Sequence, residues 1–306
     1  MIVLGFDTSN YTTSIAAFDG ESGQNCSRLL DVKPGELGLR QSDALFSHVK
    51  QLPMLAEQLF EHYRGQDVAA IGVSTRPRAV EGSYMPCFLA GVSQARVMAS
   101  ALKVPLYEFS HQQGHIAASC WSAGRPELLN EPHLAWHLSG GTTELLLVEP
   151  EGNCVAATHI GGTTDISAGQ LIDRTGQLLG LRFPAGKEID RLSSCSESKD
   201  FFKVRAKDCF FSLSGVQNKL QEFYDKTHDP EATARYCMRS VIWAVEKATK
   251  QACEQFPHLP VVFSGGVASN SMLRNTDAAP DCVFCPPQYA TDNAMGIAVL
   301  TWLQGE

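Results

Sequence analysis

Two stretches of the chain share one design and strongly constrain the fold. Residues 2–19, IVLGFDTSNYTTSIAAFD, and residues 134–148, LAWHLSGGTTELLLV, both place a polar turn of Ser, Thr or Gly between two apolar runs. Apolar runs separated by such a turn predict two strands of a β-hairpin. Because the same pattern occurs twice, we expect an internal duplication in which each copy extends a hairpin into a mixed sheet.

The remaining periodicity predicts helices that cover these sheets, so the fold class is α/β. A chain of 306 residues with 44% hydrophobic residues also exceeds the usual size of one domain, which predicts two lobes. The expected strands are 68–74, 104–109, 154–160, 261–266 and 282–285, and the expected helices are 42–63, 85–102, 167–180, 186–194, 231–255 and one starting near 293.

Composition narrows the class of protein further. The sequence has no run of eighteen apolar residues and no signal-peptide pattern, so we expect a cytoplasmic protein without a membrane span. Ten cysteines lie mostly within apolar segments, which indicates reduced core residues, and Cys282 and Cys285 are interpreted as strand residues. A net charge of −8 argues against unaided binding of nucleic acid, which would need a local basic patch or a partner protein.

Three turns suit a nucleotide. Residues 7–13, 138–144 and 263–270 are small and polar, and backbone N–H groups in such turns let phosphate oxygens approach. The third turn is expected to lead from a strand directly into a helix, whose N-terminus favours an anion. One such turn alone predicts only a tight turn, but the three together predict a nucleotide held between two lobes.

Residues 111–115, HQQGH, place two histidines on one helical face, where their ring nitrogens could share a metal ion. The spacing alone leaves open a second interpretation, two histidines on a helix surface. Asp7 and Asp173 supply carboxylates near the turns, and Asp173 falls on the polar face of an expected helix. By pattern alone, Asp173 is equally interpreted as a solvated surface residue.

Several motifs, taken in order, resemble the TsaD family of tRNA adenosine threonylcarbamoyltransferases, once labelled O-sialoglycoprotein endopeptidases. They are VLGFDTSNYTTSIAAFD, HQQGH, LSGGTTEL, AGQLIDRTGQLLGLRFPAGKEIDRL, FSLSGVQNKL, FSGGVASNSMLR and ATDNAMGIA, and the similarity runs almost end to end. The resemblance implies a two-lobed, duplicated actin-like ATPase fold related to sugar kinases and ribonuclease H. We expect an N-terminal lobe over residues 1–108 and a C-terminal lobe over 109–306, with the metal and nucleotide in the cleft between them.

The resemblance also implies a reaction. The family transfers a threonylcarbamoyl group from threonylcarbamoyl-adenylate to N6 of the adenine next to the anticodon of tRNA. Its metal ligands match His111, His115 and Asp292, a set suited to iron or zinc. His137 is a candidate further ligand, with an inward strand histidine as the alternative. No covalent nucleophile is assigned, so we expect direct attack by the adenine amine.

The resemblance further implies a site for ATP, ADP or the acyl-adenylate. Asp173 would bind the ribose, Gly186 would let the backbone approach the sugar, Asn270 would bind the nucleotide, and Glu188 is a candidate second ribose contact. The acyl-adenylate strip comprises His137, Leu138, Ser139, Gly140 and Gly141. Implied partners are tRNA and TsaB-like and TsaE-like proteins, and a homo- or heterodimer through the N-terminal lobe is expected.

The sequence departs from the family pattern in several places, among them a short segment between Asn270 and Asp292. Residues 76–78 are RPR where a G-P-G turn is usual, so the loop over 74–86 is expected to differ and to offer Arg76 and Arg78 to an anion. Thr142, Gln170 and Ala185 also replace family residues. Two alternatives follow: a paralogous carbamoyltransferase with a small-molecule acceptor, and an inactive scaffold of the tRNA-modification assembly. A protease is not favoured, because Gln112 stands where H-E-x-x-H has its glutamate.

Overall fold

The computed structural model describes residues 1–9, 11–31, 39–276 and 278–305. Its contacts divide the chain into two compact units, and the first unit is discontinuous in sequence. Residues 109–131 and 292–306 group with the first unit, so the division differs from the boundary expected after residue 108. The reason is packing, because the helices in these two segments contact each other and the first sheet. The first unit comprises Met1–Glu131, Glu149–Ala157 and Asp292–Glu306, and the second comprises Pro132–Val148 and Thr158–Thr291.

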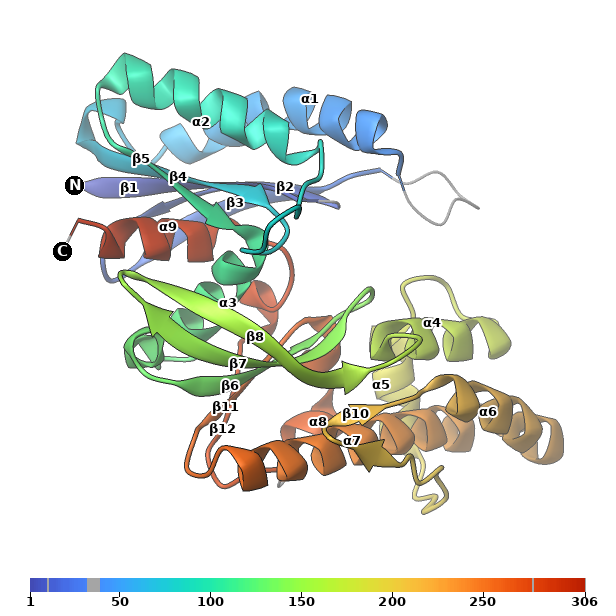
Figure 1. Cartoon of the computed structure of the whole chain (residues 1–306). Coiled ribbons are helices and arrows are strands. Elements are labelled where there is room, and N and C mark those ends of the chain that lie inside the picture. Colours follow the sequence, from blue (N-terminus) through green and yellow to red (C-terminus); the bar gives the residue numbers. More distant parts are fainter. Residues whose placement is uncertain (10, 32–38, 277, 306) are drawn as a thin grey trace. The chain divides into compact units, whose positions relative to one another are not determined.

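The first unit contains a mixed five-stranded sheet in the order β3-β2-β1-β4-β5 (Figure 1). The predicted hairpin forms its centre, since β1 and β2 pair antiparallel and every residue of both is buried. β4 and β5 then extend the sheet in parallel. Their bounds are β1 (Ile2–Thr8), β2 (Thr12–Phe18), β3 (Gly23–Leu29), β4 (Val68–Arg76) and β5 (Leu106–Ser110).

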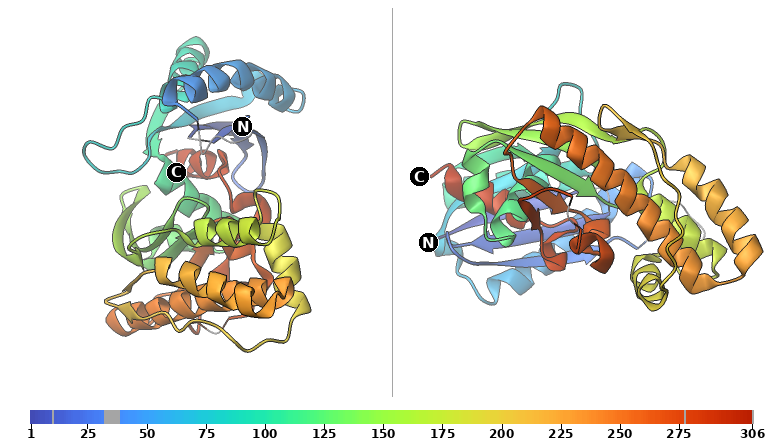
Figure 2. Two further views of the ribbon diagram at one scale, coloured as in Figure 1. Left: turned by 90° about the vertical axis from the view of Figure 1, so that its right-hand side faces the viewer. Right: turned by 90° about the horizontal axis from the view of Figure 1, so that it is seen from below.

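Helices cover both faces of this sheet, which explains why its central strands β1 and β2 are buried along their whole length. In Figure 2, α1 (Gln41–Phe60) and α2 (Phe88–Leu102) lie on one face and the red α9 (Met295–Leu303) lies on the other. α9 is apolar almost all round because it also packs against α3 (His111–Ser122). Short 3₁₀ turns at Gly65–Asp67 and Pro126–Asn130 complete the unit.

The crossing of α3 and α9 is unusually close. A Cβ added at Gly296 would lie 1.8 Å from the carbonyl oxygen of Gly114 and 2.7 Å from the backbone nitrogen of Ala118. Only glycine at 296 therefore lets the two helix backbones touch. This crossing brings the segment before α9 against the first turns of α3.

The second unit repeats the strand order of the first. Its sheet runs β12-β11-β6-β7-β8-β10-β9, with β6 and β7 as the antiparallel hairpin and with β11 and β12 added in parallel. β6, β7, β8, β11 and β12 thus correspond to β1 to β5, which confirms the predicted duplication. The bounds are β6 (His133–Leu138), β7 (Thr143–Glu151), β8 (Cys154–Thr163), β9 (Ala206–Lys207), β10 (Phe210–Phe211), β11 (Val261–Ser264) and β12 (Cys282–Phe284).

The core of the second unit lies between its sheet and the long helix α7, which is orange in Figure 2. The indole Nε1 of the fully buried Trp136 donates to Oγ1 of Thr249 on α7 at 2.9 Å, so the polar edge of the ring is satisfied in the core. The helix α6 was not predicted from the sequence. The helices are α4 (Ala168–Leu178), α5 (Gly186–Cys195), α6 (Ser214–Thr227), α7 (Pro230–Gln255) and α8 (Ser271–Arg274), with 3₁₀ turns at Gly266–Ser269 and Pro287–Tyr289.

Two expectations from composition can be compared with the structure. All ten cysteines are free thiols, as predicted. Within the described ranges, no helix has both the length and the apolar character needed to cross a membrane.

The close crossing generates the first prediction. Gly296→Ala should lower the free energy of unfolding by about 1–3 kcal/mol, because the new methyl group must push two backbones apart. Chemical denaturation measures the effect. Gly65→Ala is the control in the same unit, since a Cβ there would meet nothing within 4 Å. Equal stability of both variants would show that the helices do not cross as described.

Candidate active site

The predicted histidine pair lies at the start of α3. Strand β5 ends at Ser110, whose Oγ accepts from the backbone N–H of Gln113 at 3.2 Å. The side chain of Gln113 in turn accepts from the Ser110 N–H at 2.8 Å. This capping box begins the helix at His111, so His111 and His115 share one face, one turn apart.

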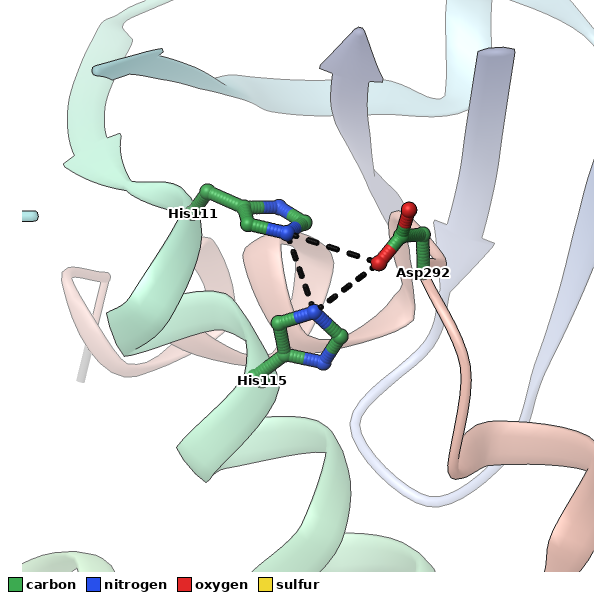
Figure 3. Close-up of side chains that lie close together, drawn as sticks. All are labelled: His111, His115 and Asp292. Atoms are coloured by element: carbon green, nitrogen blue, oxygen red, sulfur yellow. Dashed lines mark hydrogen bonds and ion pairs between the residues drawn. The ribbon is translucent and has the colours of Figure 1, made fainter. Parts of the chain in front are cut away.

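Three donor atoms from distant parts of the chain converge at this face (Figure 3). The Nε2 atoms of His111 and His115 are 3.0 Å apart. The Oδ1 of Asp292, from the segment before α9, lies 3.2 Å from the His115 Nε2 and 3.5 Å from the His111 Nε2. The structure therefore brings together the three residues predicted as metal ligands, all within the first unit.

Asp7, at the end of β1, holds the other side of the His111 ring. Its Oδ1 lies 2.9 Å from Nδ1 of His111 and also accepts from the Ser74 hydroxyl at 2.5 Å. Because a carboxylate only accepts, Nδ1 carries the hydrogen, and a neutral His111 then presents a lone pair at Nε2. Asp7 is fully buried, and its Oδ2 has no hydrogen-bond partner among the described residues. Sequence reasoning noted this carboxylate but not its role.

A second chain of contacts supports Asp292. Its Oδ2 accepts from the Ser9 hydroxyl at 3.3 Å, and the Ser9 carbonyl accepts from Nε2 of the buried His48 at 2.7 Å. Burial lowers the pKa of His48. The first predicted turn, 7–13, thus supplies Asp7 and Ser9 to this site, while its residue 10 lies outside the described residues.

The site is strongly coupled electrostatically. Burial lowers the pKa of His111, but the nearby Asp7 carboxylate, together with Asp292, outweighs it and raises the pKa to about 10. Burial alone would raise the pKa of Asp292, yet its hydrogen bonds with the two histidines hold that pKa well below the usual range. Without a metal ion, a proton at Nε2 of His111 therefore occupies the space among the three donor atoms.

The three donors fit a metal ion in number, type and spacing. Ligand atoms about 2.1 Å from a divalent ion are about 3.0 Å apart at octahedral and about 3.4 Å apart at tetrahedral edges. The observed separations of 3.0, 3.2 and 3.5 Å cover this range. Two imidazoles with one carboxylate suit iron or zinc, and Asp7 supplies the carboxylate that commonly orients a ligating histidine.

His137 belongs to the second unit, on β6, where its Nδ1 lies 3.3 Å from Oγ of Ser264. Its role as a further metal ligand stays a prediction. The neighbouring Leu138 is fully buried in the core, so only its backbone can contribute to a ligand site.

The strip predicted to bind the acyl-adenylate ends in a tight turn that rests on α4. The N–H of Ser139 donates to the Thr142 carbonyl at 2.8 Å, and the Ser167 hydroxyl donates to the Gly140 carbonyl at 2.6 Å. A Cβ at Gly169 would lie 2.5 Å from the Cα of Gly140, so glycine is needed there for α4 to approach. Sequence reasoning missed Ser167 and Gly169, although S-x-x-Q at 167–170 is a recognisable capping box.

Asp173 is half-buried rather than fully solvated. Its Oδ1 accepts from the backbone N–H of Ala185 at 2.9 Å, which fixes the start of α5. Burial raises the pKa of Asp173. A Cβ at Gly186, the next residue, would meet nothing within 4 Å, so the fold itself does not require glycine there.

The expectation for the third turn was wrong in one respect. β11 does not lead directly into an α-helix but into a 3₁₀ turn and then into the four-residue α8, because Asn270 starts a separate helix by accepting from the N–H groups of Met272 and Leu273. The Asn270 Nδ2 donates to Oδ1 of Asp190 at 2.8 Å. Asp190 was missed from the sequence. Both polar ends of Asn270 therefore have protein partners.

Three further predicted residues, Glu188, Arg76 and Arg78, lie at the surface. The exposed Glu188 forms an ion pair with Arg191 at 3.0 Å, typical of a helix-face pair. In the loop over 74–86, Arg76 and Arg78 are exposed, and the Pro77 carbonyl accepts from the backbone N–H of Gln112 at 3.0 Å. The loop thus contacts the helix that carries the histidines, and an anion-binding role for its arginines stays a prediction.

Comparison with known proteins gives a consistent result. The family described as TsaD, tRNA N6-adenosine threonylcarbamoyltransferase, matches residues 38–299. The chain is similar to the tRNA N6-adenosine threonylcarbamoyltransferase of Thermus thermophilus, with 32% identity over 99% of this chain and 92% of the relative.

Solved structures show the fold. Full-length HypF in its phosphate- and nucleotide-bound form aligns with a TM-score of 0.60 at 14% identity, covering 97% of this chain and 55% of HypF. The ROK hexokinase of Thermus thermophilus aligns with a TM-score of 0.56 at 14% identity, covering 100% and 99% of the two chains. The expected actin-like, sugar-kinase-like fold is therefore confirmed.

The raised pKa of His111 generates a prediction for the metal-free protein. A folded-state pKa of about 10, above the ordinary 6.5, gives stability that is complete below about pH 6.5 and is lost as the pH rises toward 10. In the presence of a chelator, the free energy of unfolding should fall between about pH 6.5 and about pH 8.5. Urea titrations measure this slope.

The control for this prediction compares two histidine variants. His111→Asn should flatten the slope, whereas His62→Asn, at an exposed position, should leave it unchanged. A slope that persists in His111→Asn would mean that another group titrates.

Proposed function

Because the chain belongs to the TsaD family of tRNA-modifying transferases, we propose that it transfers a threonylcarbamoyl group from threonylcarbamoyl-adenylate to tRNA. The acceptor is N6 of the adenine next to the anticodon. The observation that carries the proposal is the convergence of His111, His115 and Asp292, with Asp7 behind His111.

These three residues would hold one iron or zinc ion. When bound, the ion would supply a Lewis acid that polarises an acyl oxygen. The residues of this chain determine whether such an ion can bind. Asp7 keeps the proton of His111 on Nδ1, and Ser9 fixes the carboxylate of Asp292, so both ligand side chains are held in one orientation.

The second unit would hold the nucleotide of the donor. Gly140, Gly141, Gly186 and Gly266 support this, because a Cβ at any of them would meet no other atom within 4 Å. Protein packing therefore does not require glycine at these positions. A ligand that approaches the backbone closely would require it. Asp173 would accept from the ribose with the carboxylate oxygen that Ala185 does not use.

In the transfer, the N6 amine attacks the carbamoyl carbon, a new C–N bond forms, the C–O bond to the adenylate phosphate breaks, and AMP leaves as the amine loses a proton. Backbone N–H groups of the glycine turns would stabilise the leaving phosphate. A net charge of −8 would make the binding of tRNA to the chain alone weak at physiological salt, which supports TsaB-like and TsaE-like partner proteins.

The metal proposal predicts that His111→Ala loses bound iron or zinc. Metal content measured by mass spectrometry should fall from one ion per chain toward zero. Asp7→Asn should retain the ligands but weaken metal affinity by about 10- to 100-fold, because the orienting carboxylate is lost. His62→Ala is the control, and unchanged metal content in His111→Ala would reject the site.

The nucleotide proposal predicts that Gly186→Val weakens ATP binding without destabilising the fold, because the new side chain enters open space. Calorimetric titration with ATP should show at least a tenfold loss of affinity, equivalent to about 1.4 kcal/mol. Gly215→Val, at another open position in a helix of the same unit, is the control. Equal affinity of the Gly186 variant and the wild type would place the nucleotide elsewhere.

The reaction itself is tested in cells. Modified nucleosides of tRNA from cells with and without the gene should differ in threonylcarbamoyladenosine, and His111→Ala should fail to restore it. Unchanged tRNA modification together with intact metal and ATP binding would instead support a carbamoyltransferase with a small-molecule acceptor.

A further inference from the structure

A basic surface lies on the second unit, along residues 203–207 and α7, and includes none of the predicted site residues. A hollow of about 450 Å³ opens between residues 203–207 and the middle of α7. We call it the basic groove, and its polar lining comprises Lys203, Arg205, Lys207, Trp243, Lys247 and Gln251.

Side chains of α7 fix the opposite wall of the basic groove. Trp243 Nε1 donates to the Val204 carbonyl at 3.1 Å, and Gln251 Nε2 donates to the Ala206 carbonyl at 3.0 Å. Burial alternates along this wall: Val204 is buried and Ala206 half-buried, whereas the three basic residues between and beside them are exposed. The two hydrogen bonds from α7 hold this segment in place, so Lys203, Arg205 and Lys207 are exposed to solvent in a row.

The cations of the basic groove are held close together without acidic partners. The Nζ atoms of Lys247 and Lys203 lie 4.5 Å and 5.8 Å from the centre of the Trp243 ring. Within the part of the chain that the structure describes, Lys203, Arg205, Lys207 and Lys247 form no salt bridge. Four unneutralised cations repel one another, and the Trp243 ring offsets only part of that cost.

This cluster of positive charges contrasts with the negative net charge of the whole chain. The net charge is −8, and other surface cations, such as Lys219 and Arg191, are paired with neighbouring carboxylates. A local cluster of unpaired cations in an acidic protein indicates a polyanionic ligand.

We propose that the basic groove binds the phosphate backbone of tRNA. This inference rests on the proposed function, which makes tRNA the acceptor, and it specifies where the chain contacts that substrate. Three cations in alternate positions over five residues spread on the order of 10 Å, which suits successive phosphates better than one small anion. The Trp243 ring already carries two ammonium groups, so it orders the cations, and the contact is to backbone rather than to particular bases.

The test compares full-length variants for binding of an unmodified tRNA transcript. The triple variant K203A/R205A/K247A should bind at least tenfold more weakly at low salt. Its plot of log affinity against log salt concentration should be shallower by about two to three, because about one counterion is released per phosphate contact. Fluorescence anisotropy over a salt series measures both quantities.

Two matched variants separate charge at this place from total charge and from folding. R28A/K50A/K226A removes the same charge from exposed positions elsewhere and should bind nearly as the wild type does. K203R/R205K/K247R keeps the charge in the groove and should retain affinity and salt slope. Loss of affinity in the charge-conserving variant would mean that the wall was disturbed, and the phosphate contact would be rejected.

Other outcomes would overturn the inference. They are a wild type that does not bind the transcript at low salt, or a triple variant with the wild-type slope. A triple variant that binds tRNA normally but loses an acidic protein partner would assign it to that partner. If cells show no threonylcarbamoyl transfer while the triple variant still loses tRNA affinity, the proposed reaction is rejected. The proposed tRNA contact at the basic groove is then retained.

Discussion

The contact between the backbones of α3 and α9 is the constraint on which the candidate site depends. Gly114 stands between the two histidines of α3, and Gly296 meets it from α9. Because neither residue has a side chain, the helices approach closely enough for Asp292, just before α9, to reach the Nε2 atoms. A bulkier residue at the crossing would move the carboxylate away from both rings at once.

The sequence was sufficient for the duplicated hairpins, because in both places an apolar run stands on each side of a small polar turn. It was insufficient for the third turn, where the strand–GG pattern resembles a strand leading into a helix. Gly265 adopts a positive φ of 90° and Asn270 starts a separate four-residue helix, and neither feature follows from apolar spacing. The grouping of α9 with the first sheet likewise depends on packing between segments far apart in the chain.

The residues of the candidate site likewise fall into two groups, those that a local sequence pattern predicted and those that it did not. The i, i+4 pair at 111 and 115 is a local pattern and was predicted, whereas Asp292 was expected only through resemblance to a family. Asp7 is 104 residues from His111, and no local pattern links a strand-end carboxylate to a ring nitrogen that far away. Asp190 was missed because its partner Asn270 is 80 residues distant. Long-range polar pairs are therefore what sequence reading did not find here.

The discontinuous first unit has a consequence for biosynthesis. The ligand atoms of His115 and Asp292 are separated by 177 residues, and the whole second unit is translated between them. While the ribosome is still making the second unit, α3 has no α9 to pack against, and its histidines lack the Asp292 carboxylate, although Asp7 has already been made. A nascent chain would thus lack the full set of candidate ligands until residues 292–303 have emerged, so an ion held by all three would be loaded late, once the fold is complete.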